Sequence, residues 1–143
     1  MKKYVLIILM IVLILLLVIG YSFYNYNQAQ AFYKKINEDY ASYYNKEVVG
    51  TTLISIINRT IDINEKNSIE KDENDIYYLE NEEDSIKLYV KFLEDDRTIP
   101  MEDIAEKETE NFVQYYGTAS FKCTEIEYHE KTNNVKALYF EQI

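Results

Sequence analysis

The chain has 143 residues, with 15 basic and 25 acidic side chains and one cysteine. Beyond one apolar stretch near the N-terminus, about 120 residues remain, which is enough for one compact domain. Without Lys2 and Lys3, 13 basic side chains face 25 acidic ones, so this part carries about −12 and would repel nucleic acid and anionic lipid headgroups. We therefore expect no nucleic-acid partner.

The apolar stretch runs from Tyr4 to Phe23 and contains no charged residue. Its 20 residues would form a helix about 30 Å long, which matches the hydrocarbon thickness of a bilayer. Aromatic side chains occur near both ends, as in an interfacial belt. The stretch therefore predicts a transmembrane helix over 4–23, with the lipid bilayer as its partner and these residues among its anchor: Tyr4, Val5, Ile19, Tyr21 and Phe23.

Lys2 and Lys3 precede the stretch, whereas the first charge after it is Lys34. The positive-inside rule then predicts a cytoplasmic tail over 1–3 and a C-terminal domain outside the cell membrane. A cleaved signal peptide is the alternative, because Ala29-Gln30-Ala31 has the small-x-small form of a cleavage site.

The helix is expected to continue beyond the membrane, in a segment over 24–49. Small and aromatic residues recur at spacings of four and three, at Ala29, Tyr33, Ile36, Tyr40 and Tyr43, which predicts one helical stripe reaching about Lys46. Gly50 is predicted to break it through left-handed dihedrals.

The segment 50–143 is predicted to be a small α+β domain that ends in a ββαββ antiparallel sheet. Thr51 or Thr52 would cap a short second helix with an apolar face formed by Leu53, Ile56, Ile57, Thr60 and Ile61. A charged loop over 64–75 follows. Strands over 76–79 and 85–93 would form one hairpin. A helix over 98–116 would follow and end at Gly117. Strands over 120–129 and 135–140 would form a second hairpin with a bulge near Thr124 or Glu125.

Cys123 and His129 are the only residues of their types. A nucleophile–base pair would need hydrogen-bond contact, but six residues along a strand span roughly 20 Å. We expect a buried core cysteine and a surface histidine, and therefore no catalytic residues. A zinc site is excluded because it would need further His or Cys ligands.

Two acidic clusters, 72–75 and 82–84, offer oxygen ligands for calcium but lack the glycine and ligand spacing of an EF-hand. We read them as solvated and expect neither a metal nor a cofactor. Fifteen tyrosines include three adjacent pairs, each with one member expected to face outward. The predicted interaction surface contains Tyr43, Tyr44, Tyr77 and Tyr115.

The order of two lysines, a long apolar helix with an amphipathic continuation, and a small sheet resembles type IV pilins and the pilin-like proteins of tight-adherence systems. The glycine-phenylalanine cleavage site and the glutamate by which pilins assemble have no counterpart in residues 4–19. The segment 44–67, YNKEVVGTTLISIINRTIDINEKN, is similar to a block in uncharacterised, singly anchored proteins of low-GC Gram-positive bacteria.

Together these features predict a non-enzymatic, membrane-tethered extracytoplasmic domain that acts through contacts with an unknown protein. An accessory, pilin-like component of a surface or secretion assembly would fit this description. The alternative is a tethered module that binds a peptide, a cation or a cell-wall glycan.

Overall fold

A computed structural model describes residues 2–94, 98–107 and 109–143. The chain divides into two compact units, 1–36 and 37–143. The long helix α1 (Lys2–Ala41) forms the first unit and extends into the second. Residue 1 of the predicted tail and residues 95–97, between the predicted strand over 85–93 and the predicted helix over 98–116, lie outside the described residues.

Helix α1 confirms the expected continuation of the apolar helix, but it ends five residues before Lys46. Residues 42–46 form a turn in which Asn45 has φ 62°, and the short strand β1 (Glu47–Val49) follows at once. The chain leaves the helix there because its backbone bonds to β4 instead. Asn45 N–H donates to Cys123 O at 2.9 Å.

Gly50 does not end a helix; it begins α2 (Gly50–Lys66). No glycine has a positive φ among the described residues. A Cβ at Gly50 would lie 1.9 Å from Tyr116 O, so the position requires glycine for close backbone contact. The predicted Thr51 or Thr52 cap is also wrong, because the N-cap is Val49 and makes no side-chain capping bond.

Helix α2 buries the face that the sequence predicts, except that Ile61 is only half-buried, and it adds Ile54, Ile63 and Asn64. It extends three residues into the predicted loop because Asn64 has partners in the core. The Asn64 amide donates to Ile86 O at 2.7 Å and accepts from Ile86 N–H at 2.9 Å.

The domain contains a mixed sheet of five strands in the order β1-β4-β5-β2-β3. Beyond β1, these are β2 (Lys87–Lys91), β3 (Thr98–Pro100), β4 (Ser120–Tyr128) and β5 (Val135–Gln142). Strands β2 and β5 are parallel, and the other pairs are antiparallel. The structure is therefore α+β, but the all-antiparallel sheet of the prediction is wrong.

The first predicted hairpin does not form. Residues 76–79 make only an isolated bridge between Tyr78 and Lys71, and β2 pairs with β3 and β5. Three backbone groups of this segment form hydrogen bonds with side chains and not with a neighbouring strand. The N–H groups of Ile76 and Tyr77 donate to Asp72 Oδ1, at 2.9 and 3.0 Å, and Lys87 Nζ donates to Tyr78 O.

The predicted helix over 98–116 is a strand followed by two helices, α3 (Met101–Lys107) and α4 (Thr109–Tyr116). Thr98–Pro100 pairs with Tyr89–Lys91 at the sheet edge, where proline is tolerated. Residue 108, between the two helices, is outside the described range. Helix α4 ends before Gly117, as predicted.

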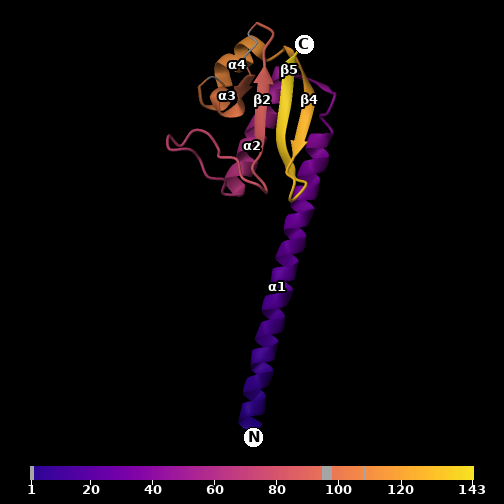
Figure 1. Ribbon diagram of the computed structural model, residues 1–143, viewed down its shortest axis with the longest axis vertical. Helices are drawn as coiled ribbons and strands as arrows, with labels where there is room; N and C mark the ends of the chain where they lie inside the picture. Colours follow the sequence, from indigo (N-terminus) through magenta and orange to yellow (C-terminus); the bar gives the residue numbers. More distant parts are fainter. Residues whose placement is uncertain (1, 95–97, 108) are drawn as a thin grey trace. The chain divides into compact units, whose positions relative to one another are not determined.

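The second hairpin is confirmed, with a register shift between Cys123 and Glu125 at the expected bulge. One face of the sheet meets α2, α3 and α4, as Figure 1 shows for β2, β4 and β5. The alternating core residues Leu88 and Val90 of β2 pair with Leu138 and Phe140 of β5. The core therefore lies between this sheet face and the helices.

Candidate functional site

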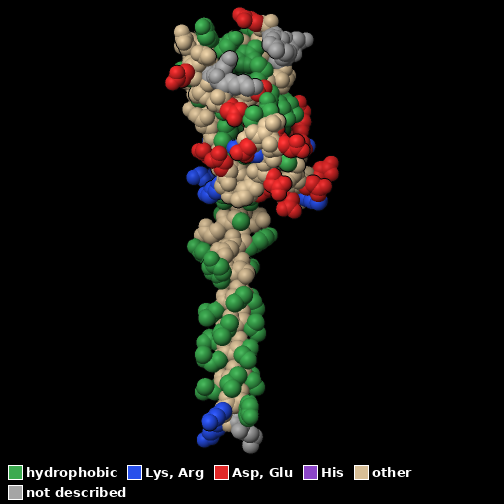
Figure 2. All heavy atoms as spheres, turned by 90° about the vertical axis from the view of Figure 1, so that its left-hand side faces the viewer, with side chains coloured by type: hydrophobic (Ala, Val, Ile, Leu, Met, Phe, Trp, Pro, Cys, Tyr) green, Lys and Arg blue, Asp and Glu red, His purple; other side chains and the backbone are tan. Residues whose placement is uncertain are grey.

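The predicted membrane residues lie on α1 with their side chains uncovered. Tyr4, Val5, Ile19, Tyr21 and Phe23 are all exposed, and Lys2 and Lys3 occupy the first positions of the helix. Within the described residues, α1 is the one helix long and apolar enough to cross a membrane. Figure 2 shows hydrophobic side chains along this helix and basic side chains at its N-terminal end.

The four tyrosines of the predicted interaction surface lie on separate elements. Tyr43 and Tyr44 are in the turn after α1, Tyr77 precedes β2 and donates to Asp103 Oδ1 at 2.6 Å, and Tyr115 is exposed on α4. Tyr44 and Tyr115 face outward from their pairs, whereas Tyr43 and Tyr77 are half-buried. These elements have different neighbours, and only Tyr44 lines one of the hollows described below.

Strand β4 has an edge that the sheet covers only in part. On the side away from β5, β1 pairs with residues 120–122, and Tyr44 forms a bridge with Cys123. Within the described part of the chain, no strand pairs with 124–128 on that side. Five residues of β4 therefore form an edge.

A groove of about 350 Å³ runs beside this edge. Its walls come from the end of α1, the turn after it and β4. We call it the edge groove, and it is lined by Ala41, Tyr44, Thr124, Glu125, Ile126 and Tyr128. Tyr44 and Tyr128 remain 55% and 42% exposed, so both rings are accessible from solvent.

A second hollow, of about 490 Å³, lies at the tip of the β4–β5 hairpin and shares Tyr128 with the edge groove. We call it the acidic cleft, because four of its nine lining residues are glutamates: Glu80, Glu82, Glu127 and Glu130. Lys131 pairs with Glu82, and Lys136 with Glu80 at 2.6 Å. Both lysines of the cleft thus already have carboxylate partners.

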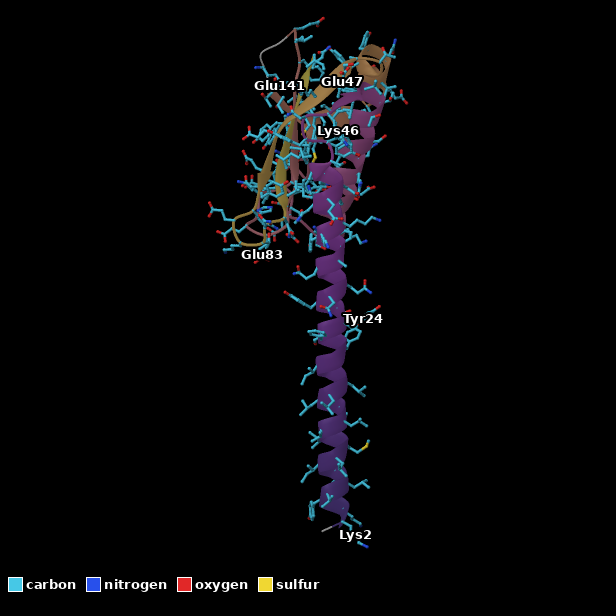
Figure 3. All side chains as sticks on the ribbon, turned by 90° about the vertical axis from the view of Figure 1, so that its right-hand side faces the viewer. Lys2, Tyr24, Lys46, Glu47, Glu83 and Glu141 are labelled. Carbon is cyan, nitrogen blue, oxygen red and sulfur yellow. The ribbon has the colours of Figure 1, made fainter. Side chains whose placement is uncertain are left out.

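The hairpin tip holds the opposite wall of the cleft through backbone contacts. Thr132 Oγ1 and Asn134 Nδ2 donate to Glu83 O at 2.6 and 3.2 Å. Figure 3 shows Glu83 at this end of the sheet, with Glu47 and Glu141 towards the other end. These bonds hold Glu83, which follows the lining residues Glu80, Asn81 and Glu82, against the hairpin.

His129 is not on the surface as predicted, because it is only 4% exposed. Its Nε2–H donates to Ser85 O at 2.7 Å, because a carbonyl oxygen can only accept a hydrogen bond. Cys123 is buried as expected, and burial raises the pKa of its thiol to about 11. The thiol is therefore protonated at neutral pH and is a poor nucleophile.

The sheet face opposite the helices carries an aromatic pair that the sequence did not predict. Tyr89 and Tyr139 stack with ring centroids 5.2 Å apart, because parallel β2 and β5 place them side by side. Tyr139 OH donates to Glu127 Oε1 at 3.2 Å. Burial and the Glu127 carboxylate raise the pKa of Tyr139 to about 12.

A buried ion pair joins β2 to α3. Lys87 Nζ lies 3.0 Å from Oε1 of Glu102, which is 3% exposed and also accepts from Tyr78 N–H at 3.2 Å. Glu102 Oε2 has no partner among the described residues. Since this pair bridges three segments of the core, its role is structural.

The acidic clusters form no metal site in the described ranges, where no three His, Cys, Asp or Glu side chains are placed to hold an ion. Asp72 instead accepts two backbone N–H groups, which lower the pKa of its carboxyl. In the second cluster, Glu82 pairs with Lys131 and Asp84 Oδ1 accepts from the Asn81 amide at 2.7 Å. These acids act in turns and surface pairs.

Comparisons of the chain with protein-family models, with curated proteins and with solved structures found no match. The edge groove and the acidic cleft are two hollows on the surface of the 37–143 unit.

Proposed function

We propose that this protein is a membrane-tethered extracytoplasmic domain that acts through contacts with another protein. Residues 4–23 would cross the bilayer with Lys2 and Lys3 in the cytoplasm, and 24–143 would lie outside. An accessory, pilin-like component of a surface or secretion assembly remains the leading role, without enzymatic activity. The observation that carries the proposal is the uncovered apolar surface of α1.

Every aliphatic side chain from Val5 to Ile19 is exposed in the structure. A helix that is apolar on all sides needs an apolar environment, because water penalises each exposed side chain. At roughly −0.3 to −0.6 kcal/mol per residue, insertion of these fifteen residues is favourable by several kcal/mol. The hydrocarbon interior of a bilayer would provide this apolar environment.

Contacts with a protein are supported by the surface of residues 37–143. This unit buries its own core, yet it retains the edge groove and exposed aromatic rings. Aromatic side chains with accessible faces are enriched at protein interfaces. The single thiol is buried and the single imidazole is bound to Ser85 O, so neither offers an evident reactive centre.

A second candidate function is a tethered module that binds a peptide, a cation or a cell-wall glycan. The stacked rings of Tyr89 and Tyr139 on the sheet face opposite the helices favour it. Aromatic faces provide apolar contact for sugar rings.

Extraction of cell membranes at alkaline pH tests the anchor. We expect the chain to stay with the membrane, and a variant with Ile11→Lys and Leu15→Lys to be released, since each lysine near a helix centre costs roughly 2.5–3.5 kcal/mol. Ser55→Lys with Asn58→Lys, at two exposed positions of α2, is the matched control and should stay membrane-bound. Release of the unaltered chain would contradict the anchor.

Two further measurements address cleavage and orientation. N-terminal sequencing of the mature protein should return the intact N-terminus, whereas a chain beginning at Phe32 would identify a signal peptide. Protease added to intact cells should degrade residues 37–143. Survival of that region until the membrane is permeabilised would place it in the cytoplasm.

Crosslinking in cells, followed by mass spectrometry, tests the protein contact. We expect one recurrent partner protein joined to residues of the 37–143 unit. An exclusively monomeric chain without crosslinked partners would contradict the proposed function, and a ligand-dependent rise in melting temperature with a soluble glycan would then favour the second candidate.

A further inference from the structure

The edge of β4 has the features needed to accept an added strand. Residues 124–128 belong to strand β4, and 125–128 pair with β5 on one side from Glu125↔Tyr139 to Tyr128↔Val135, with register shifts at Cys123/Glu125 and Glu127/Tyr128. On the other side they follow the segment that β1 covers. An extended peptide could therefore continue the position of β1 along β4 and pair with the backbone of 124–128, with which no described strand pairs on that side.

The edge groove lies where alternate side chains of such a strand would fall. Apolar and aromatic walls come from Ile126, Tyr128 and Tyr44, two of which are well exposed. In strand addition, backbone hydrogen bonds provide affinity, and pockets for alternate side chains provide specificity. The groove therefore selects a strand with apolar side chains at every second position.

The charge beside the edge defines the rest of the ligand. Glu125 lies in the edge groove, and Glu127 and Glu130 line the adjoining acidic cleft. His129 also lines the acidic cleft. Lys131 pairs with Glu82, and Lys136 pairs with Glu80 and, at 4.0 Å, with Glu127. Among the described residues, the carboxylates of Glu125 and Glu130 lie outside these pairs, so they favour Lys or Arg side chains in the ligand.

The same charges oppose pairing between two copies of this chain. An antiparallel pair of β4 edges would bring Glu125 and Glu127 of each copy close to those of the other, and like charges across strands are destabilising. The edge is therefore protected against self-association while it stays open to a strand of opposite charge.

We propose that residues 124–128 of β4, with the edge groove and the acidic cleft, bind an extended basic segment of a partner protein as an added strand. Apolar side chains would contact Tyr44, Ile126 and Tyr128, and Lys or Arg side chains would pair with Glu125 and the cleft. This inference rests on the proposed protein-contact function and names the surface and the class of partner segment.

The probe for this site is a fluorescent peptide with the sequence SKVKVKS. Titration of the full-length chain, in micelles of an uncharged detergent, should give saturable binding with Kd in the range of roughly 10–100 μM, typical of a weak, transient contact. The acidic peptide SEVEVES and empty micelles should give none. Absence of binding by SKVKVKS, or equal binding by SEVEVES, would overturn the proposal.

Methylation of the probe backbone separates strand addition from simple charge attraction without altering the protein. N–H groups of alternate residues face opposite edges of a strand. N-methylation at the two valines and at the three lysines should therefore have unequal effects, with one set abolishing binding and the other reducing it less than about threefold. Equal affinity for both methylated peptides would show that no strand is added.

Paired substitutions locate the site. Glu125→Lys should weaken binding about tenfold, whereas Glu73→Lys, which changes the net charge equally on a distant exposed loop, should change it less than about twofold. Tyr44→Ser should weaken binding about fivefold, and Tyr115→Ser, at another exposed tyrosine, should have little effect. Equal losses within either pair would contradict the assignment.

Failure of this inference and failure of the proposed function give different results. If cellular crosslinks join the 37–143 unit to a partner through α4 or the sheet face opposite the helices, the chain acts through protein contacts but not through the β4 edge. If crosslinks with a partner concentrate at Tyr44, Glu125 and Tyr128, both are supported. Crosslinks between two copies at these residues would overturn the inference.

Discussion

Residues 5–19 of α1 and residues 53–63 of α2 are both rich in Ile, Leu and Val, but their apolar side chains are exposed in α1 and mostly buried in α2. In α2 the buried side chains, including Leu53, Ile56 and Ile57, form one face, and Asn58 and Asp62 are exposed. In α1 apolar side chains surround the helix and none from Val5 to Ile19 is buried. An apolar stripe on one face of a helix can be buried against other elements of the same chain. A helix that is apolar on all sides needs an apolar environment that the chain itself does not provide.

The same contrast extends to the charges. All 25 acidic residues of the chain follow Ile36, whereas residues 1–36 contain only lysines as charged groups. Figure 2 shows acidic side chains spread over the visible face of the second unit. The first unit therefore exposes mainly apolar side chains from Val5 to Ile19, whereas the second unit carries all the acidic residues of the chain.

Truncation of a core aromatic residue should have the largest effect. Phe121 is fully buried and its ring lies within 6.0 Å of the rings of Phe92 and Phe112. Phe121→Ala should lower the free energy of unfolding by about 3–5 kcal/mol, measured by urea denaturation of the full chain in micelles. Leu13→Ala in α1 is the control, and an equal loss there would contradict the absence of packing around Leu13.

Two glycines provide a matched pair across the units. A Cβ at Gly50 would lie 1.9 Å from Tyr116 O, whereas one at Gly20 would meet no atom within 4 Å. Gly50→Ala should lower the free energy of unfolding by about 3 kcal/mol, because the backbone of Tyr116 must move to accommodate the added methyl group. Gly20→Ala should leave the melting temperature of the 37–143 unit unchanged. A neutral Gly50→Ala would show that α2 and α4 are not in close contact.

Loss of one buried amide should cost less. Asn64 exchanges two hydrogen bonds with the backbone of Ile86 and has no exposed surface. Asn64→Ala should lower the free energy of unfolding by about 2 kcal/mol, because the Ile86 N–H and C=O lose their partners. Asn58→Ala, at an exposed position of the same helix, should change stability by less than about 0.5 kcal/mol in the same denaturation experiment.

Alkaline titration should show the smallest and most gradual effect. Burial raises the pKa of Tyr40 and, with help from nearby carboxylates, those of Tyr78 and Tyr139, each to about 12. A folded pKa above the usual value of about 10 means that these groups add stability below pH 10. That stability should be lost between about pH 10 and 12.

The measurement is the tyrosinate absorbance with circular dichroism recorded in parallel. Part of the absorbance change should appear only between about pH 10 and 12, together with the loss of the circular dichroism signal. Tyr40→Phe should reduce this part, whereas Tyr115→Phe, at an exposed position, should leave it unchanged. Ionisation of all tyrosines in a single step near pH 10 would contradict the burial of these rings.

Elements whose pattern follows from local periodicity could be predicted from the amino-acid order. These are the apolar helix from Tyr4, the buried stripe of α2, the alternation in β2, the second hairpin and its bulge near Thr124. Each depends on side chains within a few residues, so a helical period or a strand period is visible without the fold. The burial of Cys123 followed from the same local pattern.

The neighbours of each strand and the burial of polar residues depend on contacts between segments far apart in the chain, so they could not be predicted from local pattern. Backbone pairing is not encoded by residue type, so nothing in the sequence placed β2 parallel to β5 or brought Tyr89 onto Tyr139. His129, Asn64 and Glu102 are buried because Ser85 O, the Ile86 backbone and Lys87 offer them partners. The open edge at 124–128 arises in the same way, since it exists only because β1 is three residues long and β4 is nine.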